Sequence, residues 1–281
     1  MGKVYLDGRF VDKLDAKVSV FDHGLLFGDG ATVGLRIVAG KLPLLDASLD
    51  QLFTTATRLG LRVSGDRVAL AAAVRETVAV NARQVGYVRI LLTRGAGMLA
   101  HDPRKCEPTV VIIADDVLPY PDDVTEHGLH VVTAKTVRRS GNVEDGGLTL
   151  SGLTAVLVKQ EALSRGCLDA LVLNASGDVN GTIDAGLYLV TDGVVVTPEP
   201  AANPDLVFTG WLLERLAEWG VAVEVRRVAA EEPQAADEAF LAGTVTGVVP
   251  VVRIDGHRVG NGEAGPVTRD IRRRALQWHH E

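Results

Sequence analysis

Short apolar runs broken by turn pairs dominate the first 120 residues of the chain. The runs Val4 to Leu6 and Arg9 to Val11 flank Asp7-Gly8, which is typical of a β-hairpin with Asp-Gly as its turn. Between Asp46 and Leu59 apolar residues recur at helical spacing, which predicts an amphipathic helix that Asp46 caps and Gly60 ends. The other patterns predict a hairpin over 35–44, a helix over 70–81, and strands over 87–93 and 109–114.

The second half of the chain continues this mixture of strands and helices. Strands are expected at 129–137, 170–174, 187–191, 194–197, 221–228 and 239–241, and helices at 152–165, 208–219 and 267–278. Hairpins in both halves together with a few helices predict an α+β fold. Two prolines and two aspartates within 119–123 predict a linker between a smaller domain, 1–118, and a larger one, 124–281.

The composition narrows the class of protein. The chain has 281 residues, of which 47% are hydrophobic, and it contains 30 glycines, values that suit a folded protein with a sizeable core. Its net charge of -7 and the absence of a basic stripe argue against a nucleic-acid partner.

Cysteine usage and hydropathy bear on location. Cys106 and Cys167 lie far apart and show no CxxC spacing, so neither a disulfide framework nor a metal site is expected. No stretch approaches the ~20 apolar residues that a membrane helix needs, and the first ten residues hold no signal core. We therefore expect a soluble cytoplasmic protein with no membrane partner.

One extended motif points to a family. The run from Val18 to Gly30 reads VSVFDHGLLFGDG, Thr93-Arg94-Gly95 follows later, and Lys159 to Ala162 reads KQEA. Together these resemble the class IV aminotransferases, the fold type IV family of pyridoxal-phosphate (PLP) enzymes. The resemblance covers nearly the whole chain. The chain is similar to branched-chain aminotransferases, D-amino-acid aminotransferases and aminodeoxychorismate lyases. It implies two α+β domains, an active-site cleft between them, and a homodimer whose partner chain builds part of that cleft.

The same resemblance implies that the family's cofactor contacts are altered. Leu148 stands at the position of the lysine that forms the imine, and leucine has no amine to form one. Gly181 replaces the glutamate that pairs with the pyridine nitrogen, and Gln51 replaces a phosphate-binding arginine. The phosphate loop falls on 205–209, where Asp205 would repel a phosphate, and only Thr244 remains of its contacts. From these replacements we expect no cofactor.

Candidate chemistry then rests on acid/base side chains. His101 matches a substrate-carboxylate contact of D-amino-acid aminotransferases and could transfer protons, although it could equally be a solvated loop histidine. Asp184 lies in the loop that lines the cofactor in relatives and could act as acid or base, or cap a turn. The substrate-binding candidates are the hydroxyls of Thr32, Thr149, Thr182, Thr244 and Thr246. By contrast, Asp22, Asp29, Arg36 and Arg94, which active relatives share, are interpreted as mainly structural.

Three functions follow. The first is a PLP-independent enzyme on the aminotransferase scaffold, of lyase or isomerase type, that eliminates, isomerises or cyclises a small carboxylate. The second is a non-catalytic binding protein that keeps the fold. The third is a PLP-dependent aminotransferase or aminodeoxychorismate-type lyase that binds its cofactor in an altered way.

Overall fold

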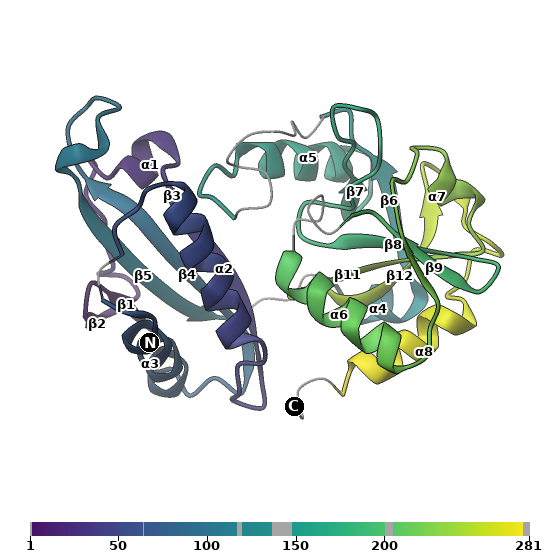
Figure 1. The fold of residues 1–281 in the computed structure, drawn as a ribbon, viewed down its shortest axis with the longest axis horizontal. Helices are drawn as coiled ribbons and strands as arrows, with labels where there is room; N and C mark the ends of the chain where they lie inside the picture. Colours follow the sequence, from purple (N-terminus) through teal and green to yellow (C-terminus); the bar gives the residue numbers. More distant parts are fainter. Residues whose placement is uncertain (1, 64, 117–119, 137–147, 200–204, 278–281) are drawn as a thin grey trace. The chain divides into compact units, whose positions relative to one another are not determined.

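A computed structural model describes residues 2–63, 65–116, 120–136, 148–199 and 205–277, which form two compact units (Figure 1). The first unit holds 2–116 and also 148–152, and the second holds 120–136 and 153–277, each with the gaps just given. Each unit has its own sheet and is described by itself. The last residues of two expected elements, 137 and 278, and residue 119 of the expected linker lie outside the described residues.

The first unit contains a five-stranded antiparallel sheet with the strand order β2-β1-β5-β4-β3. Its strands are β1 (Lys3–Leu6), β2 (Arg9–Asp12), β3 (Gly30–Val38), β4 (Val85–Ala96) and β5 (Glu107–Asp115). The expected hairpin with Asp7-Gly8 as its turn is confirmed. Strands β3 and β4 pair along the whole length of β3, from Gly30 opposite Thr93 to Val38 opposite Val85.

Two helices, α2 (Leu45–Arg58) and α3 (Arg67–Val80), cover one face of this sheet. Their buried residues pack against the inward-facing side chains of β3, β4 and β5, such as Leu35, Ile90 and Ile112. The expected cap of α2 was wrong: the helix begins one residue before Asp46, and Leu44 precedes it in a left-handed conformation with no side-chain cap.

Local hydrogen bonds explain where the other helices of this unit begin. α3 begins three residues earlier than its apolar pattern predicts, because Asp66 accepts a hydrogen bond from the Ala69 N–H. The short helix α1 (His23–Phe27) begins after Asp22 and ends at Gly28, whose φ is 69°. A single 3₁₀ turn spans Pro103–Lys105.

The second unit is built on a larger mixed sheet with the path β10-β9-β8-β11-β12-β6-β7 and with β13 paired to β12. The strands are β6 (Leu129–Thr133), β7 (Asp169–Leu171), β8 (Gly186–Thr191), β9 (Val194–Thr197), β10 (Val223–Val225), β11 (Glu238–Gly243), β12 (Gly247–Ile254) and β13 (His257–Arg258). Every strand expected in this half is present, and β12 is a further central strand. The Asp192-Gly193 turn between β8 and β9 is confirmed.

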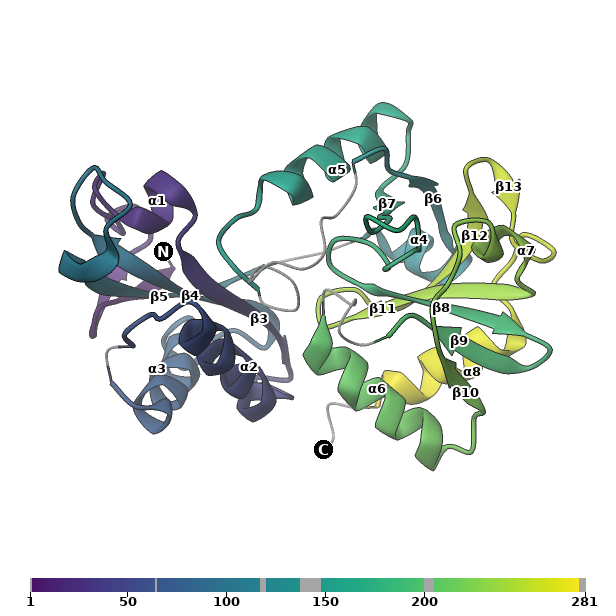
Figure 2. The same ribbon diagram turned by 45° about the horizontal axis from the view of Figure 1, so that its top comes forward.

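The helices of the second unit are α4 (Asp122–His127), α5 (Leu153–Ser164), α6 (Leu206–Glu218), α7 (Glu232–Ala235) and α8 (Pro266–Ala275). Figure 2 shows α6 and α8 near each other along the sheet and α5 next to β7. Of α5 only Val158 and Ala162 are buried, against β6 and β7.

The segment expected to be a linker takes part in the second unit. Tyr120 is buried in that unit's core, and α4 begins at Asp122. Within the described ranges no helix is both long and apolar enough to cross a membrane. The cytoplasmic location stays a prediction.

Candidate functional site

The face of the first sheet that points away from α2 and α3 carries polar side chains on β3 and β4. Successive side chains of a strand point to opposite faces, so the residues between the core positions of β3 share this face. In the β3–β4 register, the residues of this face are Thr32, Gly34 and Arg36, opposite Leu91, Arg89 and Tyr87 in that order.

This face holds two guanidinium groups without a carboxylate partner among the described residues. Arg36 is half-buried, and loss of solvent lowers the pKa of its guanidinium. It makes no hydrogen bond or ion pair within the part of the chain that the structure describes. Arg89 is exposed, and its Nε lies 3.4 Å from Thr32 Oγ1. A planar guanidinium binds a carboxylate with two parallel hydrogen bonds, so this face can bind a small organic acid.

Gly34 makes room on this face for an aromatic ring. A Cβ at Gly34 would lie 1.6 Å from Tyr87 Oη and 2.3 Å from Tyr87 Cζ. The phenol of Tyr87 therefore lies across the backbone of β3, between the two arginine positions in the register. No side chain larger than glycine fits at residue 34 while the ring holds this place.

Leu148 lies on the same face. Residues 148–150 pair with the start of β3: Thr32 N–H donates to the Leu148 carbonyl at 2.8 Å, and Leu150 N–H donates to the Gly30 carbonyl at 3.1 Å. Ala31 and Thr149 form the bridge, so Leu148 stands directly opposite Thr32 and shares its side of the sheet. The Leu148 side chain is 36% exposed, whereas Thr149 faces the core side with Ala31. Of the expected substrate-binding residues of this unit, only Thr32 therefore faces Leu148.

His101 lies elsewhere in the first unit, in the exposed loop after β4. Its ring packs on Phe27 with 4.7 Å between centroids, and Phe27 in turn packs on the buried His23 at 4.9 Å. His23 Nε2 lies 2.9 Å from the Met98 carbonyl oxygen, and Cys106 Sγ lies 3.7 Å from Nδ1. Stacking thus holds the His101 ring in place, while the ring itself remains accessible to solvent.

The acidic residues of the VSVFDHGLLFGDG run are structural, as expected. Asp22 is 1% exposed and accepts hydrogen bonds from the Gly24 N–H at 2.7 Å and the Thr93 hydroxyl at 2.8 Å. Asp29 forms a two-point ion pair with Arg94. Arg36 was expected to be structural too, and this interpretation does not account for its unpaired guanidinium. The sequence signal that could have found this face is that Thr32, Arg36, Tyr87 and Arg89 fall between the apolar core positions of two strands.

In the second unit, Asp184 lies in the loop 180–186, on its exposed side. A buried pair lies beside this loop: the Tyr120 hydroxyl donates to Asp169 at 2.5 Å. The Thr182 hydroxyl lies 3.5 Å from the Ala185 carbonyl oxygen. Burial raises the pKa of the Asp169 carboxyl. Burial is also the main reason why the pKa of Tyr120 is raised, and the negative charge of Asp169 raises it further. Asp184 belongs to the second unit and His101 to the first.

Gly181 has no room for a side chain. Its φ is +108°, a conformation that glycine favours, and a Cβ there would lie 2.5 Å from the Ala185 carbonyl oxygen. An acidic residue at 181 would therefore require a different path of the loop. Gln51, which the resemblance places where relatives have a phosphate-binding arginine, belongs to the first unit. It lies half-buried on α2 with its amide 3.4 Å from Thr55 Oγ1.

The N terminus of α6 carries a carboxylate from the chain itself. Asp205 precedes the helix, and its two oxygens accept separate backbone hydrogen bonds, from Phe208 N–H at 3.0 Å and from Thr244 N–H at 2.5 Å. Burial raises the pKa of this carboxyl. Nearby, the hydroxyl of Thr246 is directed at backbone carbonyls, at 3.1 Å from that of Gly247. Among the expected threonines of this unit, Thr244 is thus engaged with Asp205, and Thr246 with its own turn.

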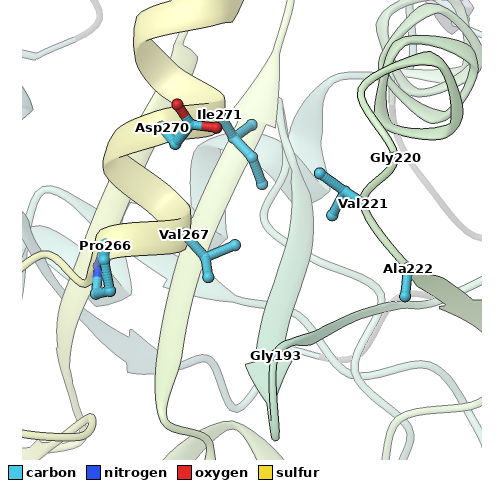
Figure 3. Close-up of a pocket in the computed structure, with 8 residues that line it drawn as sticks. All are labelled: Gly193, Gly220, Val221, Ala222, Pro266, Val267, Asp270 and Ile271. Atoms are coloured by element: carbon cyan, nitrogen blue, oxygen red, sulfur yellow. The ribbon is translucent and has the colours of Figure 1, made fainter.

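Figure 3 shows an open pocket of about 460 Å³ in the second unit. Val267 and Ile271 of α8 point across it toward Val221, and Gly193 of the β8–β9 turn lies at its edge. Its one acidic residue, Asp270, is paired with Arg273 and Arg274. None of the expected site residues lines this pocket.

Comparison with known proteins identifies close likenesses over the whole chain. The family description "Amino-transferase class IV" matches residues 33–254. A putative branched-chain-amino-acid aminotransferase of Methanocaldococcus jannaschii is 36% identical over 274 residues, which cover 96% of this chain and 94% of that protein. A T.th. branched-chain amino acid aminotransferase, solved with pyridoxamine 5′-phosphate, has a TM-score of 0.93 at 26% identity, covering 98% and 93%. A 4-amino-4-deoxychorismate lyase of Pseudomonas aeruginosa has a TM-score of 0.82 at 28% identity, covering 98% of each chain.

These likenesses contradict our expectation that no cofactor takes part. The matched family is one of aminotransferases, and the T.th. enzyme was solved with a form of the PLP cofactor. The described residues do not fit that group through the contacts that the resemblance implies, because Leu148 offers no amine, Gly181 no carboxylate, and Asp205 a negative charge. These replacements change the chemical groups that a bound cofactor would meet. They do not establish that the protein works without one.

Proposed function

Because this chain belongs to the class IV aminotransferase family, we propose that it is an enzyme of small amino or oxo acids and that Arg36 and Arg89 bind the substrate carboxylate. The observation that carries the proposal is the pair of guanidinium groups on the outward face of β3 and β4, which no described carboxylate neutralises. A half-buried cation without a counter-charge is costly unless a ligand supplies the anion. The family match supports an organic acid as that ligand.

The proposed chemistry is proton transfer at the carbon next to the acid's carboxylate or keto group. Elimination, isomerisation and transamination of such acids share this step. His101 and Asp184 are the proposed acid/base groups, because both side chains are accessible and the His101 ring is held by its contact with Phe27. Thr32 is proposed to orient the Arg89 guanidinium through their 3.4 Å contact. The substrate contacts expected at Thr149, Thr182, Thr244 and Thr246 stay predictions, because the structure places Thr149 on the core side and directs the Thr246 hydroxyl at backbone carbonyls.

Hydrogen exchange in heavy water tests this function directly. Leucine, valine, D-alanine and the matching oxo acids are incubated with the protein, with and without added PLP, and exchange at the reacting carbon is followed by proton NMR. We expect exchange with at least one acid. Arg36→Met and Arg89→Met should each weaken its apparent affinity by about tenfold or more, the effect of losing a charged hydrogen-bond partner.

The matched control is Arg75→Met. Arg75 is exposed on α3, which packs on the opposite face of the same sheet, so this change should leave exchange unaltered. Equal effects of all three substitutions would overturn the role of the β3–β4 face. If neither cofactor condition gives exchange or binding of any of these acids, the enzyme proposal fails and the non-catalytic alternative is favoured. His101→Gln and Asp184→Asn should lower the exchange rate and leave the affinity nearly unchanged.

We also infer that the protein is a homodimer. Large apolar side chains lie exposed on α1, just before it and in the adjoining loop after β4, including Phe21, Leu25, Phe27, Met98 and Leu99. A contiguous apolar surface of this kind on a soluble domain is typical of an interface. Sedimentation equilibrium should give twice the chain mass, and Leu25→Glu combined with Leu99→Glu should give monomers. A monomeric wild-type protein at micromolar concentration would refute this inference.

A further inference from the structure

The N terminus of α6 has the features of an anion site. The first N–H groups of a helix have no partner within it, and the helix dipole adds partial positive charge there, which together favour a phosphate or carboxylate. α6 has 13 residues, enough for that dipole to develop. A second element contributes as well, because the Thr244 N–H, from the turn after β11, points at the same place.

The anion found there is part of the chain. Asp205 directs one carboxylate oxygen to Phe208 N–H and the other to Thr244 N–H. It thus does more than cap the helix, since an ordinary cap satisfies only N–H groups of its own helix. By contrast, Asp66 at the start of α3 accepts only from the Ala69 N–H of that helix and is exposed.

We propose that Asp205 is a built-in anion that takes the place of a ligand phosphate at the N terminus of α6, and so makes the protein discriminate against phosphate-bearing ligands there. The argument has two parts. Both converging N–H groups are already engaged, and an incoming phosphate would meet a carboxylate of the same sign at hydrogen-bond distance. Asp205 is half-buried, so solvent screens that repulsion only in part.

This inference goes beyond the proposed function and concerns the phosphate group alone. A cofactor held by other contacts is compatible with it. It addresses one end of the cofactor, the phosphate, which the sequence resemblance places on 205–209 and Thr244.

The test compares PLP with pyridoxal, which lacks the phosphate. Their dissociation constants are measured by isothermal titration for the full wild-type protein and for Asp205→Ser. Serine keeps an N-cap hydroxyl for the helix and removes the charge, which leaves the Thr244 N–H open. We expect the wild-type protein to bind the two compounds within about twofold, and Asp205→Ser to bind PLP at least about tenfold more tightly than pyridoxal.

Asp66→Ser is the matched control, because it makes the same change at an N-cap in the other unit. Its ratio of the pyridoxal dissociation constant to the PLP dissociation constant should equal that of the wild type. A wild-type protein that already prefers PLP by tenfold would overturn the proposal, and so would an Asp205→Ser ratio that does not rise. The result is independent of the exchange assay above. A gain in phosphate binding with no exchange would refute only the proposed function.

Discussion

The hydroxyl of Tyr87 occupies the place that a side chain on Gly34 would need. The two residues are on neighbouring strands, and a Cβ on Gly34 would fall 1.6 Å from Tyr87 Oη. The absence of a side chain at Gly34 therefore makes room for the Tyr87 ring, whose neighbours in the register are Arg36 and Arg89.

Gly34→Ala should therefore lower the free energy of unfolding by about 1–3 kcal/mol, the usual cost of overpacking. Urea denaturation measures this change. In a Tyr87→Ala background the same substitution should cost clearly less, because the atoms that it would meet are gone. The same cost in both backgrounds would show that the ring and the glycine are not coupled.

Leu148→Lys should give the protein a lysine that reacts with PLP. The side chain at 148 is on the outward face opposite Thr32 and is 36% exposed, so an amine there would be accessible. After addition of PLP and borohydride, mass analysis should find the reduced adduct on residue 148, with about tenfold more label than on other lysines. Ser151→Lys, also exposed, serves as the control. Equal labelling of the two introduced lysines would mean that the face at 148 gives no selectivity.

Asp22→Ala should destabilise the protein by about 2–3 kcal/mol, because it leaves both the Gly24 N–H and the buried Thr93 hydroxyl without their acceptor. Asp66→Ala removes an exposed N-cap with a single hydrogen bond and should cost about 1 kcal/mol. Chemical denaturation of both variants gives the comparison. A loss at Asp22 no larger than that at Asp66 would contradict the structural role assigned to it.

The titration of Asp169 should lower the free energy of unfolding as the pH rises. Its pKa is raised in the folded protein, mainly by burial, so between about pH 4 and that raised value the folded state binds more protons than the unfolded state. The stabilisation is complete below the unfolded pKa and is lost as the pH passes through the folded one. Unfolding free energies of wild type and Asp169→Asn are measured across this range. The advantage of the wild type over the variant should be largest at low pH and should shrink as the pH rises. A difference that moves in the opposite direction would show that Asp169 is held as a stabilised carboxylate.

The sequence predicted most elements but placed their ends poorly. Apolar periodicity located α2, α3, α5, α6 and α8, yet the helix starts depend on single backbone hydrogen bonds, such as those accepted by Asp66 and Asp205. At α2 the chain uses a left-handed Leu44 where propensity favours Asp46, a choice that tertiary packing of Leu45 imposes. The central strand β12 follows a turn that is rich in glycine and threonine, and its even burial on both faces leaves no alternation to detect.

The site could be predicted less well than the fold. Alignment by motif puts Leu148 at the position of the family's lysine, but only the pairing of Leu148 with Thr32 shows that its side chain lies on the polar face. Arg36 was interpreted as structural because a sequence does not reveal which arginines lack a partner. Membership of the aminotransferase family, rather than any single residue, corrected the expectation about the cofactor.

The pairing of residues 148–150 with β3 also affects how the chain is made. β3 is the last strand in the first unit's sheet order, so its free side has backbone groups that could pair with another chain. The residues that cover part of that side come more than a hundred positions later in the sequence, at Leu148 and Leu150. During synthesis this edge therefore stays uncovered until residue 150 has left the ribosome, and a fragment that stops at 116 keeps it open to aggregation.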